Sequence, residues 1–323
     1  MRAVRVHQFN LDVPMRLEEV PDPQPAAGQV LIRTGAAAIN PVDVAIRQGV
    51  HPYAKLVKPP YVPGAEAAGD IVALGPGVQG LKVGQRVFGR AVGGGYAERV
   101  LLDARGTAEL PERYSYAEGA SITVAYGTAW NALVIKAEAG PGETVLIQGG
   151  AGGVGMAAVQ LAKRLGCRVL ATVSSKEKAD FCRLMGADET INYKTEDFAA
   201  RCQELTGGRG VDVIVELAAC DNFDKDLDAI RVEGRIVVVG TGTGKGPKAE
   251  FRVPAAMTRD ARVIGMAAIN LAPKLPEVFR RFGALLKEGL KVHVDRQVRL
   301  DEANEAHDLV LSGKFLGKVV ITA

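Results

Sequence analysis

The chain has 323 residues, of which 47% are hydrophobic and 24% charged, with a net charge of +3. The length suffices for two domains with cores of their own, and the composition is that of an ordinary globular protein. The small net charge argues against nucleic acid or an anionic membrane surface as a partner. No apolar run reaches the ~20 residues of a membrane-spanning helix, and the start MRAVRVHQFN predicts a strand rather than a signal peptide.

Residues 1–118 are predicted to be mostly β-structure. Strand-like runs such as AVRVHQF and QVLIRTGAAAI are separated by turn clusters rich in Gly and Pro. Short strands with frequent turns favour a barrel-like or sandwich-like domain.

Strands and helices alternate over residues 119–267, which predicts a parallel sheet covered on both faces. The last segment is predicted to form a helix, a strand and a second helix. A closing strand, GKVVITA, would then rejoin the first domain.

The cysteines are Cys167, Cys182, Cys202 and Cys220. None forms a CxxC pair, and no histidine lies at ligand spacing from any of them. We interpret them as reduced thiols, which favours a reducing compartment, and we expect a cytoplasmic protein.

The segment IQGGAGGVG contains Gly150-x-Gly152-x-x-Gly155 between a predicted strand and an amphipathic helix. This context is typical of a dinucleotide-binding turn. We expect Gly150 to permit the tight turn, Gly152 to let the backbone approach a pyrophosphate, and Gly155 to let the helix pack closely. The N–H groups at the helix start would then face the anion.

The end of the next strand, RVLATVSSKEK, distinguishes NAD from NADP. An acid there accepts hydrogen bonds from the ribose hydroxyls and repels a 2′-phosphate. No acid occurs from Arg168 to Lys176. Ser174 and Ser175 can donate to phosphate oxygens, and Lys178 offers a compact cation. The sequence therefore predicts NADPH rather than NADH, although Lys178 as a solvated surface lysine is the alternative.

Motifs along nearly the whole chain resemble the medium-chain dehydrogenase/reductase superfamily, and within it the zinc-independent quinone oxidoreductases of the zeta-crystallin type. They are MRAVRV at the start, INPVDVAIRQG at 39–49, PGAEAAG at 63–69, VGQRVFG at 83–89, GGYAERV at 94–100, GTAWNAL at 127–133, GGAGGVG at 149–155, INY at 191–193, IVVVGTG at 236–242 and NEAHDLV at 304–310.

The resemblance implies an α/β protein with a GroES-like, β-rich catalytic domain and a Rossmann doubly wound coenzyme domain. The catalytic domain would comprise residues 1–120 and 268–323. The NADPH-binding domain would comprise residues 121–267, with the active site in the cleft. It also implies a homodimer or homotetramer joined through the Rossmann sheet.

The resemblance further assigns coenzyme contacts to groups of residues that follow the strands. Ala151, Gly152, Gly153 and Val154 would line the pyrophosphate turn. Ser174, Lys178 and Tyr193 would surround the 2′-phosphate; the alternative for Tyr193 is a packed aromatic at a loop. Asn222 would approach the coenzyme in the crevice of the sheet. Those expected toward the nicotinamide are Asn40, Thr128, Val239, Gly240, Thr241, Gly242, Met266, Ala267 and Ala268.

No metal site is expected. Zinc-dependent relatives carry a Cys at the position of Asn40, a His–Glu pair at Ala65 and Glu66, and a further Cys near Val124. A catalytic zinc takes three protein ligands, and only Glu66 could serve here. Without zinc, suitable hydride acceptors are those that delocalise the added charge themselves, such as quinones, enones and enoyl thioesters.

Candidates for polar catalytic groups are Asn40, Asp43, Tyr53 and Thr128. Asn40 would offer an N–H to the substrate oxygen or hold the nicotinamide. We interpret Asp43 as a structural partner, for example of Arg47, in preference to an acid catalyst. Tyr53 lies in HPYAKLVKPPY, a predicted lid loop.

Two positions depart from the family or stay unassigned. Ala45 replaces a Tyr that the family often has beside the active site, which suggests a wider or differently shaped substrate pocket. Lys314 is not assigned to the 2′-phosphate, because loop length varies in this region.

The predicted activity is NADPH:quinone oxidoreductase. One alternative within the superfamily is reduction of an enone or of an acrylyl- or enoyl-CoA. Another class is a non-catalytic NADPH-binding or RNA-binding protein of the crystallin type. RNA binding would need a basic stripe with interleaved aromatics, and aromatic residues are only 5% of the chain.

Overall fold

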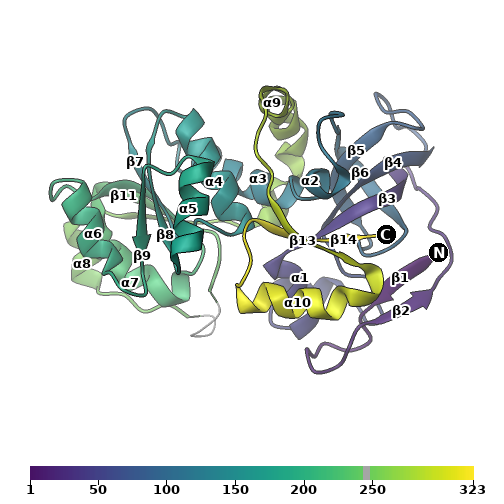
Figure 1. Cartoon of the computed structure of the whole chain (residues 1–323), viewed down its shortest axis with the longest axis horizontal. Helices are drawn as coiled ribbons and strands as arrows, with labels where there is room; N and C mark the ends of the chain where they lie inside the picture. The colour runs from purple at the N-terminus through teal and green to yellow at the C-terminus, as the bar shows by residue number, and fades with distance from the viewer. Residues whose placement is uncertain (243–247) are drawn as a thin grey trace. The chain divides into compact units, whose positions relative to one another are not determined.

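The computed structural model describes residues 1–242 and 248–323, which divide into two compact units. One, here called the terminal unit, combines Met1–Val124 with Ala272–Ala323; the other, the central unit, is the continuous segment Ala125–Leu271. Both units mix helices and strands, so the predicted α/β class is confirmed (Figure 1). No helix in the described ranges is long and apolar enough to span a membrane.

The terminal unit is built on a six-stranded sheet with a separate two-stranded hairpin. Its strands are β1 (Arg2–Arg5), β2 (Arg16–Glu19), β3 (Gln29–Ile39), β4 (Glu66–Leu74), β5 (Arg86–Val92), β6 (Arg99–Glu109), β13 (Val294–Arg299) and β14 (Lys318–Thr322). The larger sheet has the order β13-β14-β3-β4-β5-β6, and β6 also pairs with β3. This second pairing closes β3–β6 into a barrel, one of the two forms that the turn-rich sequence predicts.

Short helices surround this barrel. They are α1 (Pro41–Gln48), α2 (Tyr116–Ala120), α9 (Leu275–Glu288) and α10 (Ala303–Ser312), with the 3-10 segments η1 (Pro52–Leu56) and η4 (Leu300–Glu302). The predicted closing strand is confirmed, because β14 pairs antiparallel with β3. Val319, Ile321 and Ile39 from these two strands all lie in one hydrophobic core.

The central unit contains a six-stranded sheet in which every neighbouring pair is parallel. Its strands are β7 (Thr144–Ile147), β8 (Arg168–Val173), β9 (Glu189–Asn192), β10 (Val211–Glu216), β11 (Ile230–Val238) and β12 (Arg262–Gly265). The strand order is β12-β11-β10-β7-β8-β9, the doubly wound arrangement of the Rossmann fold. All residues of β10 are buried, so helices cover both faces of the sheet as predicted.

Most helices of this unit are crossovers between those strands. These crossovers are α4 (Gly153–Arg164), α5 (Lys176–Met185), α6 (Phe198–Leu205), α7 (Ala219–Ala229) and α8 (Val253–Thr258). Before the first strand lies α3 (Thr123–Trp130), which continues into the π-helix η2 (Asn131–Lys136), and after the last strand begins the 3-10 segment η3 (Ala268–Lys274). Figure 1 shows α4, α5, α6 and α7 around the parallel strands.

Candidate coenzyme and substrate sites

The loops that the sequence assigns to the coenzyme lie along one edge of the central sheet. Parallel strands all end at the same edge, and ligands of such sheets bind outside it. Backbone hydrogen bonds continue just beyond this edge, from Tyr193 N–H to the Val173 carbonyl (3.1 Å) and from Met266 N–H to the Val238 carbonyl (3.1 Å). The residues after β8 and β9 are therefore aligned side by side, and so are the residues after β11 and β12.

The glycine turn joins β7 to α4 and fits a pyrophosphate. Gly152 is the N-cap of α4 and makes no side-chain cap, so the first N–H groups of the helix stay available to an anion. A Cβ at Gly152 would have its nearest neighbour 3.8 Å away, which leaves the approach open. Ala151 is buried beneath the turn, and Gly153 and Val154 follow half-buried in the first helical turn.

The structure corrects the role predicted for Gly150. The left-handed residue of the tight turn is Gly149, with φ of +67°. A Cβ at Gly150 would lie 2.7 Å from the Ala171 Cβ, so Gly150 is needed for close packing against β8 instead. A Cβ at Gly155 would lie 2.3 Å from the Gly149 carbonyl oxygen, so α4 packs directly on the turn, as predicted.

Hydroxyl groups and lysines gather where β8 ends. Ser175 is the N-cap of α5, and its Oγ accepts the Lys178 N–H (3.2 Å), so this hydroxyl has a structural role. Ser174 is half-buried beside it. Tyr193 is 52% exposed and is not a packed aromatic. Ser174, Lys178 in the first turn of α5, and Tyr193 after β9 thus come from neighbouring segments at this strand end.

Lys194 adds a second cation that the sequence interpretation missed. Burial, and next the nearby charge of Lys194, lowers the pKa of Lys178 below its usual value. The Lys194 backbone is held by a hydrogen bond from its N–H to Asn192 Oδ1 (3.2 Å). The available signal was its position directly after Tyr193, because the loop after β9 adjoins the end of β8.

The segments after β10 and β11 are hydrogen-bonded to each other, at the part of this edge that lies away from β8 and β9. The N–H groups of Ala219 and Cys220 donate to the carbonyls of Gly240 and Thr241 (both 3.0 Å). A Cβ at Gly240 would lie 2.4 Å from the Leu217 carbonyl oxygen, so the close approach requires a glycine. Beside this pair lie Asn222 on α7, Val239 and Gly242 after β11, and Ala267 and Ala268 after β12.

Asn40 belongs to a buried polar cluster in the terminal unit. Its Nδ2 donates to Glu66 Oε1 (2.9 Å), and its Oδ1 accepts from Lys318 Nζ (2.5 Å). Lys318 also forms an ion pair with Glu66 (3.1 Å), and their side chains are 4% and 0% exposed. Both polar atoms of the Asn40 carboxamide are therefore bonded within the protein. Thr128, the other residue assigned beside the nicotinamide, is a buried residue of α3.

The positions that correspond to zinc ligands are linked through Glu66. Its second oxygen, Oε2, accepts the Val124 N–H (2.7 Å). Glu66 thus bonds to Asn40, Val124 and Lys318 at once. Within the described ranges, no group of three or more His, Cys, Asp or Glu side chains is placed to hold a metal ion.

Asp43 is also buried and lies beside this cluster. Its Oδ2 accepts the Asn40 N–H (2.8 Å) and the Tyr96 hydroxyl (3.3 Å), and burial raises the pKa of Asp43 to about 7. The suggested partnership with Arg47 is wrong. The Arg47 guanidinium donates instead to the carbonyls of Leu11 (3.1 Å) and Val13 (3.0 Å).

Tyr53 lies in η1, where its ring meets His51 edge-on at a centroid distance of 4.5 Å. His51 Nδ1 also accepts the Tyr53 N–H (3.2 Å), so the histidine fixes this tyrosine. Nearby Leu56 is 69% exposed.

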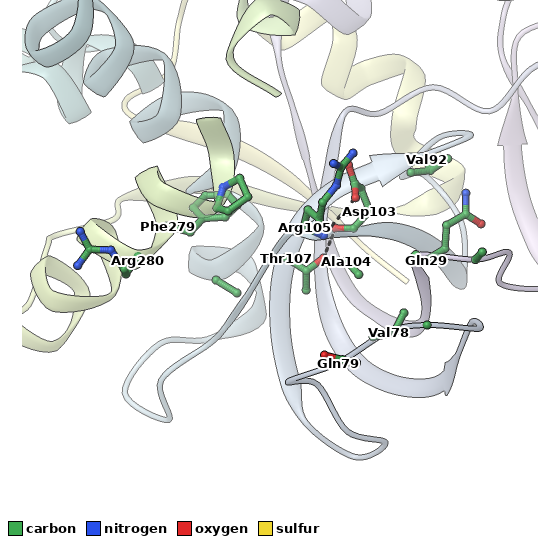
Figure 2. A pocket seen from close by; sticks show the side chains of 15 residues that line it. Gln29, Val78, Gln79, Val92, Asp103, Ala104, Arg105, Thr107, Phe279 and Arg280 are labelled. Carbon is green, nitrogen blue, oxygen red and sulfur yellow. Dashed lines mark hydrogen bonds between the residues drawn. The ribbon is translucent and has the colours of Figure 1, made fainter. Parts of the chain in front are cut away.

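A cavity of about 900 Å³ lies elsewhere in the terminal unit, among residues of β3, β6 and α9 (Figure 2). Asp103, Arg105 and Phe279 contribute to its lining. None of the site residues predicted from the sequence lines it.

Comparisons with known proteins agree with this two-part architecture. Residues 26–112 match the family described as alcohol dehydrogenase GroES-like domain, and residues 153–287 match the family described as zinc-binding dehydrogenase. Together with the doubly wound sheet and its glycine turn, these matches define a medium-chain dehydrogenase/reductase.

A quinone oxidoreductase of Rattus norvegicus is 35% identical over 99% of this chain and 97% of its own length. Quinone oxidoreductase from Escherichia coli, solved in complex with NADPH, has a TM-score of 0.90 at 27% identity, and each chain covers 100% of the other. A mycobacterial protein complexed with NADPH has a TM-score of 0.89 at 30% identity, again with full coverage of both chains. The chain belongs to the quinone oxidoreductase family.

The buried ion pair of Lys318 gives a stability prediction. Lys318→Met would leave the Glu66 carboxylate buried without a counter-charge, so we expect the free energy of unfolding to fall by about 3–5 kcal/mol. Urea unfolding measures this change. The double variant Lys318→Met/Glu66→Gln should recover much of the loss, and exposed Lys314→Met serves as the control. Equal stability of Lys318→Met and Lys314→Met would contradict the prediction.

Proposed function

We propose that this chain is an NADPH-dependent oxidoreductase that reduces quinones or related activated alkenes. The observation that carries the proposal is the end of β8, where hydroxyls and two lysines take the place of an acid beside a dinucleotide-type glycine turn. The relatives that share the full chain length are quinone oxidoreductases, and solved structures of this fold contain NADPH. NADPH supplies the hydride when it is bound.

Different groups of residues would bind different parts of the coenzyme. The start of α4, with Ala151 through Val154, would hold the pyrophosphate. Ser174, Lys178, Tyr193 and Lys194 would hold the 2′-phosphate, because charge-assisted hydrogen bonds to phosphate are stronger than neutral ones. The loops after β10, β11 and β12 would border the nicotinamide, and the resemblance adds Asn40 and Thr128 to the residues that contact it.

The residues at the positions that correspond to zinc ligands limit which substrates the protein is expected to reduce. Zinc would stabilise an alkoxide, but the corresponding positions supply one carboxylate, and Glu66 is already bonded to Lys318. The acceptor is therefore expected to spread the added negative charge over its own conjugated carbonyl, as quinones and enones do. Positioning and electrostatics remain the protein's contribution.

A direct assay tests the activity. NADPH oxidation, followed by its absorbance, should proceed with a naphthoquinone at a higher kcat/KM than with a short enoyl-CoA, because the resemblance is to quinone reductases. A higher value with the enoyl-CoA would favour the alternative within the superfamily. No turnover with any acceptor, despite NADPH binding, would favour the non-catalytic alternative.

Coenzyme choice gives a second prediction. Lys178→Ala should raise KM for NADPH about 10- to 100-fold and leave KM for NADH nearly unchanged, because only NADPH carries the phosphate that pairs with it. Lys194→Ala should act in the same direction with a smaller effect, since Lys194 is more exposed.

The matched control is Lys176→Ala on the same helix. Lys176 is 89% exposed and pairs with Asp180, so its removal should change neither KM. An equal rise in KM for both coenzymes in Lys178→Ala would refute the phosphate assignment.

We also propose a homo-oligomer, formed through the edge of the central sheet. β12 is an edge strand and carries Val263, which is 50% exposed, and Met257 on nearby α8 is 70% exposed. An apolar edge with unpaired backbone groups is suited to pairing with a second copy.

A reducing compartment such as the cytoplasm would suit the four free cysteines, of which three are buried.

Light scattering after size-exclusion chromatography tests the oligomer. The wild type should elute as a dimer or tetramer, and Val263→Lys should shift it toward the monomer, because a charge would have to be buried in the joined edge. Leu184→Lys on α5, where the leucine is 63% exposed, is the control and should keep the wild-type mass. A monomeric wild type would contradict this proposal.

A further inference from the structure

Two carboxyl groups are buried directly beneath the coenzyme edge of the central unit. Glu216 is the last residue of β10, Asp226 lies on α7, and both are 0% exposed. Neither forms an ion pair with a Lys, Arg or His of the part of the chain that the structure describes. Buried carboxylates without a counter-charge are costly, so this pair calls for a physical explanation.

A shared proton explains it. The charges of the two carboxyl groups act on each other, and Asp226 Oδ2 has no hydrogen-bond partner among the described residues. Ionised carboxylates only accept hydrogen bonds, so a bond between two of them requires that one be protonated. Burial, and next the charge of Glu216, raises the pKa of Asp226 well above its ordinary value.

From Asp226 a chain of hydrogen bonds leads to the glycine turn. Gln148 Nε2 donates to Asp226 Oδ1 (2.9 Å), and Gln148 Oε1 accepts from the Thr172 hydroxyl (2.8 Å). Thr172 Oγ1 in turn accepts the Gly149 N–H (2.9 Å). Gly149 is the left-handed residue of the turn, so the chain ends on the residue that sets the turn's path.

From Glu216 a second branch leads to the loop after β10. The Glu216 carboxylate accepts the Ala218 N–H and, at 3.4 Å, the Asn222 side-chain amide. Asn222, in the first turns of α7 after this loop, is expected to approach the coenzyme. One buried network therefore joins the pyrophosphate side of the edge to the nicotinamide side.

We propose that Thr172, Gln148 and Asp226 are positioning residues, which fix the glycine turn relative to the β10 loop through one proton held between Asp226 and Glu216. This inference rests on the proposed coenzyme site. A preformed turn lowers the conformational cost of binding, so the network would contribute to affinity for both NADPH and NADH.

Other titratable groups near the pair do not supply a positive charge. From α6 the Cys202 thiol faces Asp226, and Asp221 on α7 faces Glu216. Charged groups on the flanking elements have other partners: Asp197 with Lys225, Asp224 and Asp228 with Arg252, Asp212 with Arg231, and Glu143 with Arg235. The proton is therefore the group that relieves the repulsion between Glu216 and Asp226.

A hydroxyl deletion with its rescue tests the branch to the turn. Thr172→Val removes the acceptor of the Gly149 N–H without changing the side chain's shape, so the Kd values for NADPH and for NADH should each rise about 5- to 10-fold. Thr172→Ser keeps the hydroxyl and should bind both coenzymes as the wild type does. This parallel effect differs from Lys178→Ala, which would discriminate between the coenzymes. Isothermal calorimetry supplies the Kd values.

An isosteric amide tests the shared proton. In Asp226→Asn, Oδ1 can still accept from Gln148 and the amide can donate to Glu216, so NADPH binding near neutral pH should be retained. The wild type should lose affinity as the pH rises and the pair gives up its proton, whereas Asp226→Asn should lose none of it for this reason. The variant has no titratable group at position 226, so a loss of affinity at high pH that occurs only in the wild type would report on the shared proton.

Unfolding measurements give an independent readout. A raised pKa means that the folded protein holds a proton that the unfolded chain releases, so the free energy of unfolding falls as the pH rises between the two pKa values. Asp226→Asn should reduce that slope. If wild type fails to bind NADPH, the proposed function is wrong; if wild type binds but Thr172→Val binds equally well, or the pH profiles of wild type and Asp226→Asn coincide, the positioning network is wrong.

Discussion

Parallel pairing of the central strands is the constraint on which the coenzyme site depends. Because β7, β8, β9, β10, β11 and β12 all run in one direction, their carboxyl ends meet at one edge. Segments far apart in the chain, such as the glycine turn after β7 and the Tyr193 loop after β9, thereby lie along the same edge. The same constraint places Glu216 and Asp226 under this edge, where their burial requires a proton to be shared.

Local patterns predicted much of this architecture. The glycine turn, the strand RVLATV and the hydroxyl-rich segment after it are contiguous in sequence, so their chemistry is readable without tertiary contacts. The motif predicts Gly150 as the turn residue, whereas the structure places the turn at Gly149, because the motif gives the spacing of glycines but not their φ values. Only the packing of Gly150 on Ala171 shows which constraint applies to which glycine.

Nonlocal contacts were the part that the sequence did not reveal. The Lys318 ammonium reaches Asn40 and Glu66 from the last strand, and no spacing rule relates positions so distant. Lys194 was not predicted, because it belongs to the loop after β9, whereas the sequence pattern that distinguishes NADPH from NADH lies directly after β8. Arg47 was paired with Asp43 from their proximity on α1, but the guanidinium points to two backbone carbonyls instead.

The antiparallel contact between β14 and β3 also governs the order of assembly during synthesis. Residues 125–271 are complete before β14 leaves the ribosome, so the nucleotide-binding sheet can form while one side of β3 still lacks its neighbour. Until β14 is synthesised, Ala37 and Ala38 lack their strand partners on this side of β3. Such an unpaired apolar edge can pair with the wrong strand. The larger sheet of the terminal unit is thus begun before the central unit and completed after it.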